Sequence, residues 1–309
     1  MAHWRNKVSV IIDLHKTSQH NVGKRQDMSL IKLNMATSIK KGTIMKYHPD
    51  LDWQPSVTSI MPIMQSAKHV LVLTGSGLSA ESGIPEDADV LPALRGEVPL
   101  QHIKRLETYA KEPELIWGWC EWLRMRSMKA QPNAAHHALV RLADKMTVTL
   151  ATQNMDDLHE RAGSHAVLHL DGYLNHSSCL SCHSPHALTP DIPHEPAHGR
   201  KVAPPTCQHC GGIIRPGIIW RSVKNTQAWI TTQTVAKTCD VLLLIGHPDT
   251  SATQRLAVLV SRRGKPVIKI GNEESTINTF ADVVLKGSPS ELLPRLVDCV
   301  LQGETACSY

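Results

Sequence analysis

The segment from Val70 to Pro85, VLVLTGSGLSAESGIP, constrains the fold of this chain more than any other stretch. Its four aliphatic residues, 70–73, are typical of a parallel strand that is buried on both faces. Gly75 and Gly77 follow, and residues without a Cβ let a backbone turn tightly and approach a ligand closely. A helix behind this turn would direct its free N–H groups at an anion such as a pyrophosphate. A plain tight turn between a strand and a helix would leave the same pattern, so this segment alone does not decide between the two.

Short aliphatic runs alternate with helical patterns along most of the remaining chain. Strands are predicted at 146–151, 167–170, 240–245, 266–270 and 282–285, and helices at 56–67, 114–128, 225–237, 251–263 and 290–301. Pro132-Asn133 offers a cap for a further helix through Leu139 and Leu142, and a short helix is predicted to end at Gly163. Strands that alternate with helices form a parallel sheet with right-handed crossovers, whose helices cover both faces. The sequence therefore predicts an α/β fold.

Two C-x-x-C pairs, Cys179/Cys182 and Cys207/Cys210, lie in a stretch that is rich in Cys, His and Pro. Each pair can place two thiolates on one side of a tight turn, and two such turns complete a tetrahedral four-sulfur zinc site. The 24 residues between the pairs exceed the usual spacer of about 15–20, a difference that a loop absorbs. Six histidines lie nearby, so the replacement of one thiolate by an imidazole stays open. Because four protein ligands leave no open coordination position, we predict a structural zinc ion in a small insertion at 176–211.

The composition places the chain among globular proteins, with 41% apolar and 20% charged residues. No apolar run approaches the ~18 residues of a membrane span, so we expect no membrane association. Paired cysteines without a secretory signal favour an intracellular, reducing compartment. The first 46 residues carry nine Lys or Arg against two acids, which fits a transit peptide, a basic arm or a poorly ordered leader. The cysteine stretch has few basic residues and no aromatic ladder, which argues against nucleic acid as a partner.

Taken in order, these motifs resemble those of the sirtuins, the family of NAD-dependent protein deacylases. The resemblance runs from about Ser56 to Leu301 and is nearest to the branch that removes acidic acyl groups, judged by Trp117, Pro132-Asn133 and residues 154–163. The matching stretches are Thr74–Gly77, Ser79–Pro85, Thr152–Asp156, Leu158-His159, Arg161–Gly163, the two cysteine pairs, Gly211–Pro216 and Ile218–Trp220.

The resemblance implies a Rossmann-like domain that binds NAD or ADP-ribose, a smaller zinc-bearing domain, and an acyl-lysine peptide in the cleft between them. We expect a basic leader at 1–54, the Rossmann-like domain at 55–175 and 212–303, and the zinc insertion at 176–211, with a helical part of the small domain at about 86–130. The implied cofactor-binding residues are Gly75, Ser76, Gly77, Gln153, Asn154, Asp156 and Gly246. Asn154 and Asp156 are candidates for the nicotinamide pocket, and their alternative role is to cap the helix that follows.

Departures from the family pattern gather at the expected reaction centre. The family's base is a histidine immediately before a glycine, and Asp171 stands in that place. The further departures are Glu86-Asp87-Ala88 in place of the Phe and Arg that cover NAD, Arg221-Ser222-Val223 in place of the acyl-lysine channel wall, Gly246-His247-Pro248 in place of Gly-Thr-Ser, and Cys120 and Leu123 in place of the Tyr and Arg that recognise acidic acyl groups.

The chemistry of Asp171 predicts low activity. A carboxyl group with a pKa near ~3.9 is a poorer proton acceptor at neutral pH than an imidazole near ~6.5, and general-base catalysis contributes typically about 10²–10⁴-fold. His169 shares a strand face with Asp171 but lies roughly 6–7 Å back along the strand, so we expect a packing role for it.

We therefore predict a sirtuin-type protein that binds NAD and zinc, has weak or no deacylase activity, and acts by binding acylated protein lysine or a protein partner. The alternative is an enzyme that works with an altered site, either a slow deacylase or an ADP-ribosyltransferase that uses Asp171. In either case the candidate catalytic residues are Asp171, Asn154 and Asp156.

Overall fold

The computed structural model describes residues 53–86, 100–189, 201–220, 226–248, 250–272 and 276–303. The predicted leader, 1–54, lies almost entirely outside these ranges. No helix in the described ranges is long and apolar enough to cross a membrane.

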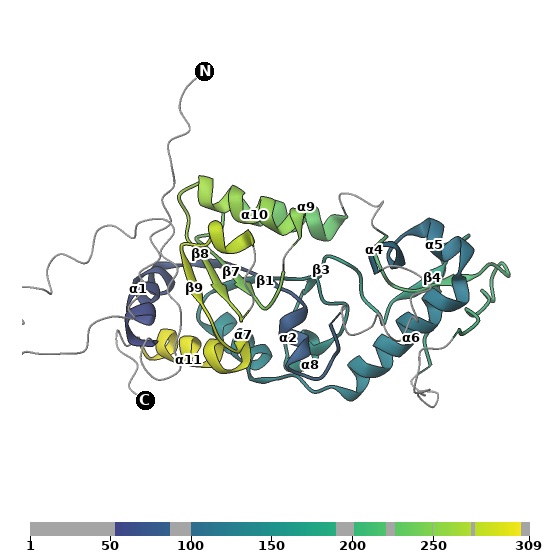
Figure 1. Ribbon diagram of the computed structural model, residues 1–309, viewed down its shortest axis with the longest axis horizontal. Helices are drawn as coiled ribbons and strands as arrows, with labels where there is room; N and C mark the ends of the chain where they lie inside the picture. Colours follow the sequence, from purple (N-terminus) through teal and green to yellow (C-terminus); the bar gives the residue numbers. More distant parts are fainter. Residues whose placement is uncertain are drawn as a thin grey trace, which may run out of the picture.

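The core is a six-stranded sheet in which every neighbouring pair of strands is parallel (Figure 1). In spatial order the strands are β3 (Leu168–His169), β2 (Thr147–Thr152), β1 (His69–Thr74), β7 (Val241–Ile245), β8 (Val267–Ile270) and β9 (Val283–Leu285). β1 is central, since Val72 pairs with Leu150 on one side and with Leu243 on the other. The predicted α/β class and the parallel sheet are thereby confirmed.

Helices cover both faces of this sheet, as the alternating pattern predicted (Figure 1). Val70 and Val72 pack in one apolar cluster with side chains of α1 (Trp53–Ser66), α7 (Ala134–Lys145) and α11 (Pro289–Gln302). Leu71 and Leu73 point to the opposite face, where α9 (Gln227–Ala236), α10 (Ser251–Arg262) and the 3-10 helix η2 (Thr276–Thr279) complete a second cluster. The unbroken aliphatic run of β1 is therefore explained by burial on both sides.

Capping residues determine where several of these helices begin and end. Asn133 caps α7, because its side chain accepts from the N–H groups of Ala135 and His136. Thr250 caps α10 in the same manner. Gly163, at φ +107°, ends α8 (Leu158–Ala162), as its position behind a short helical pattern predicted.

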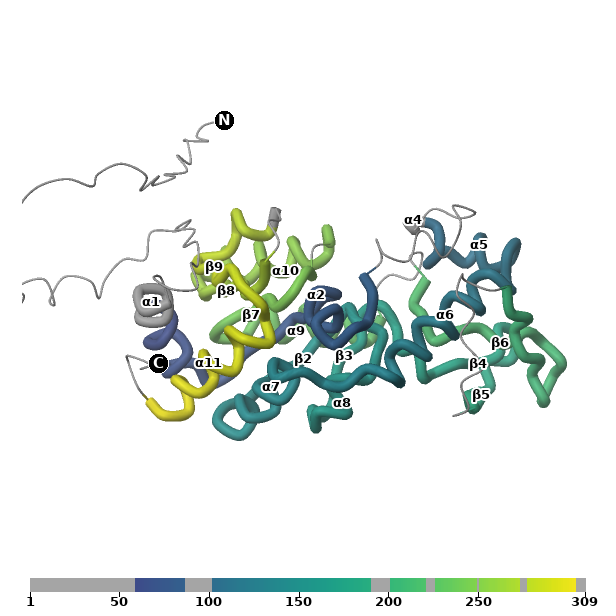
Figure 2. Tube along the Cα trace, turned by 60° about the horizontal axis from the view of Figure 1, so that its bottom comes forward, coloured from purple at the N-terminus to yellow at the C-terminus, as the bar shows by residue number. Residues whose placement is uncertain are grey.

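The remaining elements gather at the end of the molecule opposite α11 (Figure 2). A three-stranded antiparallel sheet consists of β5 (Pro185–His186), β4 (Ser177–Cys179) and β6 (Ile214–Arg215). Beside it lie α4 (Leu100–Ile103), α5 (Leu106–Lys111) and the long α6 (Pro113–Lys129). Trp117 of α6 packs against Cys179, Cys207 and Ile214, so this helix and the cysteine region share one apolar cluster.

Candidate functional site

The order of the strands marks where a ligand is expected to bind. From β1 the sheet continues through β2 and β3 on one side and through β7, β8 and β9 on the other. In open parallel sheets, ligands bind outside the carboxyl ends of the strands at such a reversal. Gly75 directly follows β1, Gln153 follows β2 and Gly246 follows β7. The fold thus brings the predicted cofactor residues to one edge of the sheet.

Two glycine turns cross in close backbone contact at this edge. The N–H of Gly75 donates to the carbonyl of Ile245 at 3.0 Å. A Cβ on Gly75 would lie 2.5 Å from the carbonyl carbon of His247, and one on Gly246, at φ +73°, would lie 2.7 Å from the nitrogen of Leu78. Only glycine fits at either position, because the obstacles are backbone atoms. Both glycines are therefore needed for the packing of these turns, whatever ligand binds beside them.

The short helix α2 (Ser76–Ala80) follows the first glycine turn, as the sequence predicted. Gly75 precedes it and offers no side chain to cap it. The N–H groups of its first turn, which begins at Ser76 and Gly77, therefore suit an anionic ligand such as a pyrophosphate. With five residues, α2 has a small dipole, and any attraction comes mainly from these local N–H groups.

Asn154 and Asp156 hold the glycine turn from the side of β2. Asn154 Nδ2 donates to Ser79 Oγ at 2.7 Å and to the carbonyl of Gly75 at 3.1 Å. Ser79 in turn donates to Asp156 Oδ2 at 2.7 Å, and Asp156 Oδ1 accepts from the N–H of Leu158 at 3.1 Å. Leu158 is the first residue of α8, so Asp156 accepts a hydrogen bond at the start of this helix. This is the capping role that the sequence offered as the alternative to ligand binding. Burial raises the pKa of the Asp156 carboxyl, against the opposing effect of these hydrogen bonds.

Gln153 lies at the open side of the same edge. Its Nε2 donates to Thr250 Oγ1 at 3.2 Å, which links the end of β2 to the start of α10.

A buried polar chain below this edge includes two histidines that the sequence did not single out. Thr74 donates to Thr152 at 2.8 Å, and His159 Nε2 lies 3.0 Å from Thr74 Oγ1, so this nitrogen carries the proton. The ring of His136 lies 4.8 Å from that of His159. Burial lowers the pKa of His136 to about 4 and that of His159 well below its usual value.

Both rings are therefore neutral at physiological pH. His136 Nδ1 lies 3.2 Å from the backbone nitrogen and 2.9 Å from the Oδ1 of Asn133, so it can accept from the one or donate to the other. The Nε2 of His136 and the Nδ1 of His159 are both buried and have no hydrogen-bond partner among the described residues. Both histidines lie on helical faces among apolar residues, and nothing in the sequence indicates that they meet.

Asp171, the residue in the place of the family's base, forms an ion pair that the sequence did not predict. Its Oδ2 accepts from Lys104 Nζ at 2.9 Å, with the Lys104 side chain 12% and the Asp171 side chain 30% exposed. Lys104 lies between α4 and α5, whereas Asp171 follows β3. The carbonyl of Asp171 also accepts from the N–H of Ile219 at 2.9 Å. No local pattern connects positions so far apart in the chain.

His169 has the packing contacts that were expected of it. Its Nδ1 lies 3.1 Å from the carbonyl of Asn154, and its Nε2 lies 2.8 Å from Glu160 Oε1. The ring also packs on Tyr173, with 4.6 Å between ring centroids. Both ring nitrogens are therefore occupied, and His169 is not available as a substitute base.

The other departures from the family pattern fall into three groups. The backbone of His247-Pro248 packs against Gly75 in the crossing turns. Cys120 and Leu123 are buried in the apolar cluster that α6 forms with Trp220, and they present no polar group to a ligand. Residues 87–88 and 221–223 lie outside the described ranges.

The four predicted metal ligands come together at the end of the small sheet. The sulfur atoms of Cys179, Cys182, Cys207 and Cys210 all lie within 4.8 Å of one another. The Cys179–Cys210 and Cys182–Cys207 sulfur distances are 3.5 and 3.7 Å. Zn–S bonds of about 2.3 Å in a tetrahedron place the sulfurs about 3.8 Å apart, so the cluster fits a zinc ion. Backbone N–H groups of Cys182 and Ser181 point at the Cys179 sulfur and lower the pKa of its thiol, which favours the thiolate that zinc binds.

Comparison with known proteins agrees with this arrangement. Residues 75–253 match the model of the Sir2 family. The NAD-dependent protein deacylase of Methylococcus capsulatus is 40% identical over 78% of this chain and 96% of its own length. That of Pseudomonas putida is 35% identical over 76% of this chain and 90% of its own length. The crystal structure of a Sir2 homologue in complex with NAD superposes with a TM-score of 0.69 at 31% identity, covering 79% of this chain and 94% of the homologue.

Proposed function

Because the chain belongs to the Sir2 family, we propose that it is a sirtuin-type protein that binds NAD or ADP-ribose and a structural zinc ion, and that it deacylates lysine weakly or not at all. The observation that carries the reduced activity is the ion pair between Lys104 and Asp171. The glycine turns at Gly75–Gly77 and at Gly246 lie where the strand order reverses, and they support the proposed binding of NAD or ADP-ribose.

Cofactor binding is supported by the chemistry of the sheet edge and by the relatives. A Sir2 homologue of the same fold binds NAD, and this chain keeps Gly75, Ser76, Gly77 and Gly246 where the strands reverse. In the proposed complex, the N–H groups at the start of α2 hold the pyrophosphate. Asn154 and Asp156 keep this turn in place, and Gln153 lies beside it at the end of β2.

The reduced activity follows from how Asp171 is held. The base in this chemistry takes a proton from a ribose hydroxyl. A carboxylate is weakly basic to begin with. Here one of its oxygens already accepts from an ammonium ion at 2.9 Å, so that oxygen is occupied and is not free to take the ribose proton. The second oxygen can accept a hydrogen bond from a ribose hydroxyl, so the same contact is compatible with binding.

The altered-enzyme alternative has one observation in its favour. The side chain of Asp171 is 30% exposed, so it is not sealed off from a ligand. An acylated lysine of a protein remains the proposed substrate or binding partner. We also propose the division into a Rossmann-like part at 55–175 and 212–303 and a zinc insertion at 176–211.

Release of nicotinamide from NAD, with and without acetyl-lysine and succinyl-lysine peptides, tests this proposal. Titration calorimetry on the same sample establishes whether NAD binds, and the Methylococcus relative serves as the active reference. We expect NAD binding with peptide-dependent release at least about 10²-fold below the reference. Release at the rate of the reference would overturn the proposal. Peptide-independent release that leaves ADP-ribose on protein would favour the transferase alternative.

A further inference from the structure

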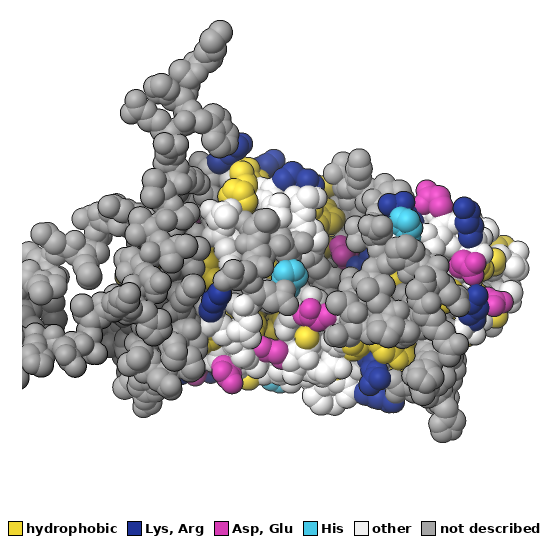
Figure 3. Space-filling model, in the orientation of Figure 1, with side chains coloured by type: hydrophobic (Ala, Val, Ile, Leu, Met, Phe, Trp, Pro, Cys, Tyr) yellow, Lys and Arg dark blue, Asp and Glu magenta, His cyan; other side chains and the backbone are white. Residues whose placement is uncertain are grey.

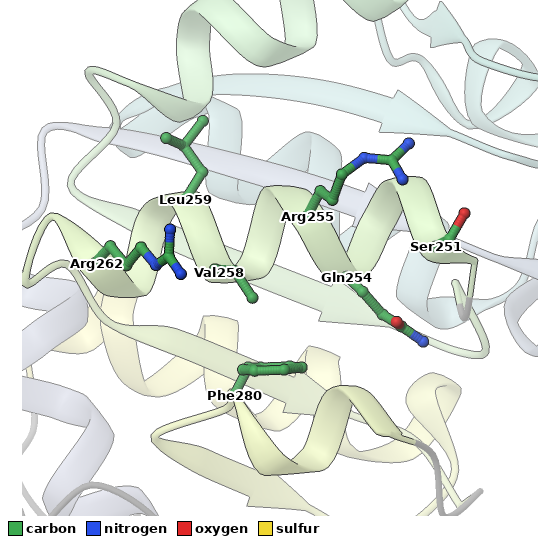
Figure 4. Close-up of a pocket in the computed structure, with 7 residues that line it drawn as sticks. All are labelled: Ser251, Gln254, Arg255, Val258, Leu259, Arg262 and Phe280. Atoms are coloured by element: carbon green, nitrogen blue, oxygen red, sulfur yellow. The ribbon is translucent and has the colours of Figure 1, made fainter. Parts of the chain in front are cut away.

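The outer side of α10 carries a surface groove that is unrelated to the strand reversal. It has a volume of about 660 Å³ and is lined by side chains of α10 together with Phe280, which follows η2 (Figure 4). The inward side of the helix is formed by Thr253, Leu256, Ala257 and Val260, all of which are buried. The groove residues therefore lie on the side of α10 that the sheet does not cover.

The groove combines an apolar floor with two cationic side chains. Val258, Leu259 and Phe280 supply the apolar part, and the Phe280 ring lies below α10 near Val258 (Figure 4). Arg255 and Arg262 are seven positions apart, which is close to two helical turns or about 10 Å along the axis. Both arginines line the groove together with these apolar side chains.

The positive charge of this face is not neutralised by acidic residues of the same segment. Residues 251–265 contain four cations, Arg255, Arg262, Arg263 and Lys265, and no acid. Lys265 pairs with Asp240, whereas the three arginines have no ion pair in the described ranges. Lys and Arg atoms line the edge of the molecule where α10 lies (Figure 3). An arginine on a partly apolar surface is well suited to a carboxylate, which it binds with two parallel hydrogen bonds.

Charge complementarity also distinguishes between the segments that could occupy this groove. The chain's own first 46 residues carry nine cations and two acids, so they are repelled by this face. A helix with carboxylates two turns apart and apolar side chains between them matches both the spacing and the floor. We propose that the α10 face binds an acidic amphipathic helix of a partner protein, whose carboxylates pair with Arg255 and Arg262. Arg262 lies at the end of α10 away from Thr250 and Gln153, so its role on this surface can be tested separately from the proposed NAD site.

Fluorescence anisotropy of a labelled alanine-based helical peptide tests the proposal on the full chain. The peptide carries two glutamates seven residues apart, with two leucines between them on the same face. We expect saturable binding, weakened about tenfold or more when both glutamates are replaced by glutamine. Replacement of the two leucines by serine should also weaken it, which tests the apolar floor without any change to the protein.

Two adjacent arginines provide the matched pair of variants. Arg262→Glu and Arg263→Glu change the net charge equally, but only Arg262 lines the groove. We expect Arg262→Glu to weaken peptide binding about tenfold or more, and Arg263→Glu to change it less than about threefold. Absence of binding, equal binding of the glutamine peptide, or equal losses in the two variants would each overturn the proposal. So would a dimer in sedimentation that Arg262→Glu dissociates, because the occupant would then be a second copy. NAD binding of both variants should be unchanged.

Discussion

At the scale of single residues, the behaviour of Asp171 depends on a cation from a distant part of the chain. Lys104 donates to it from the turn between α4 and α5. A histidine introduced at position 171 would therefore face an ammonium ion. A nearby like charge disfavours the protonated imidazole that the reaction must form. The Lys104 ammonium should therefore also limit the activity of a variant that carries a histidine base at position 171.

We predict that Asp171→His alone raises peptide-dependent nicotinamide release less than about tenfold. The double variant Lys104→Ala/Asp171→His should exceed it because the opposing charge is removed, yet remain below the Methylococcus relative, since misplacement of reacting atoms by about 1 Å costs about 10²-fold. The assay uses acetyl-, succinyl- and long-acyl-lysine peptides. Lys111→Ala/Asp171→His is the control, because Lys111 is exposed. A rise of two orders of magnitude in the single variant would show that Asp171 is the only defect.

The buried histidines predict a pH dependence of stability. His136 titrates at about 4 in the folded chain and near 6.5 when unfolded. Between these values the unfolded state binds more protons, so the free energy of unfolding decreases as pH falls through this range. At pH 5 the loss from His136 amounts to about 2 kcal/mol. His159, whose pKa is also lowered, acts in the same direction.

Urea unfolding at pH 7.5 and 5.0 measures this effect. The parent should lose about 2 kcal/mol more than His136→Gln on going to pH 5.0. His165→Gln, at an exposed position, should behave like the parent. The raised pKa of Asp156 acts in the opposite direction, but it is common to all three proteins and cancels in the comparison. Equal pH slopes in the parent and His136→Gln would contradict the assignment.

At the scale of elements, the small sheet cannot be stable by itself. β4, β5 and β6 have three, two and two residues, which is short even for strands in larger sheets. Their surroundings are held by the apolar cluster of Trp117, Cys179, Cys207 and Ile214. A zinc ion bound by four cysteines would supply the missing stability, because structural zinc couples directly to the folding of such small units.

We predict about one zinc ion per chain and its loss in Cys207→Ala, with a lowered unfolding temperature. Metal analysis and calorimetry of unchelated protein measure the two quantities. Cys239→Ala is the control, since Cys239 is equally buried but packs against the large sheet, and it should retain the metal. Folded parent protein without zinc would refute the prediction.

At the scale of the whole molecule, the site that we propose takes residues from two regions of the fold. The crossing glycine turns belong to the large sheet, whereas Lys104 comes from the helices beside the small sheet. In the proposed complex, we therefore expect the large sheet to supply most contacts to the adenosine and pyrophosphate. We expect weaker contacts to the nicotinamide end, because the sequence has Asp87 and Ala88 in place of the family's Phe and Arg.

We accordingly predict that ADP-ribose binds within about threefold of NAD, because the shared part of the two ligands supplies most of the contacts. Gly75→Ala should abolish both, since its Cβ would lie 2.5 Å from the backbone of His247. Titration calorimetry measures both affinities. NAD binding far tighter than ADP-ribose would show an intact nicotinamide pocket, and binding of neither would show that the fold is only structural.

The elements and the metal ligands were readable from the sequence because their signals are local. The aliphatic run of β1, the cap at Asn133 and the stop at Gly163 each depend on a few neighbouring residues. The two cysteine pairs carry their ligand spacing in the chain itself. Asp171 was identified differently, through the resemblance to the sirtuins, whose base stands immediately before a glycine. Strand β3 was predicted at four residues and has two, Leu168 and His169, since only these find partners on β2.

Contacts between distant segments were decided only by the tertiary structure. Lys104 meets Asp171 across 67 positions, and the ring of His136 meets that of His159 from a different helix. The strand order that aligns Gly75 with Gly246 also results from packing of the helices on the sheet. Periodicity indicates which face of an element is buried, but it carries no information on which other element covers that face. For that reason the resemblance could point to Asp171, whereas only the fold showed that Lys104 pairs with it.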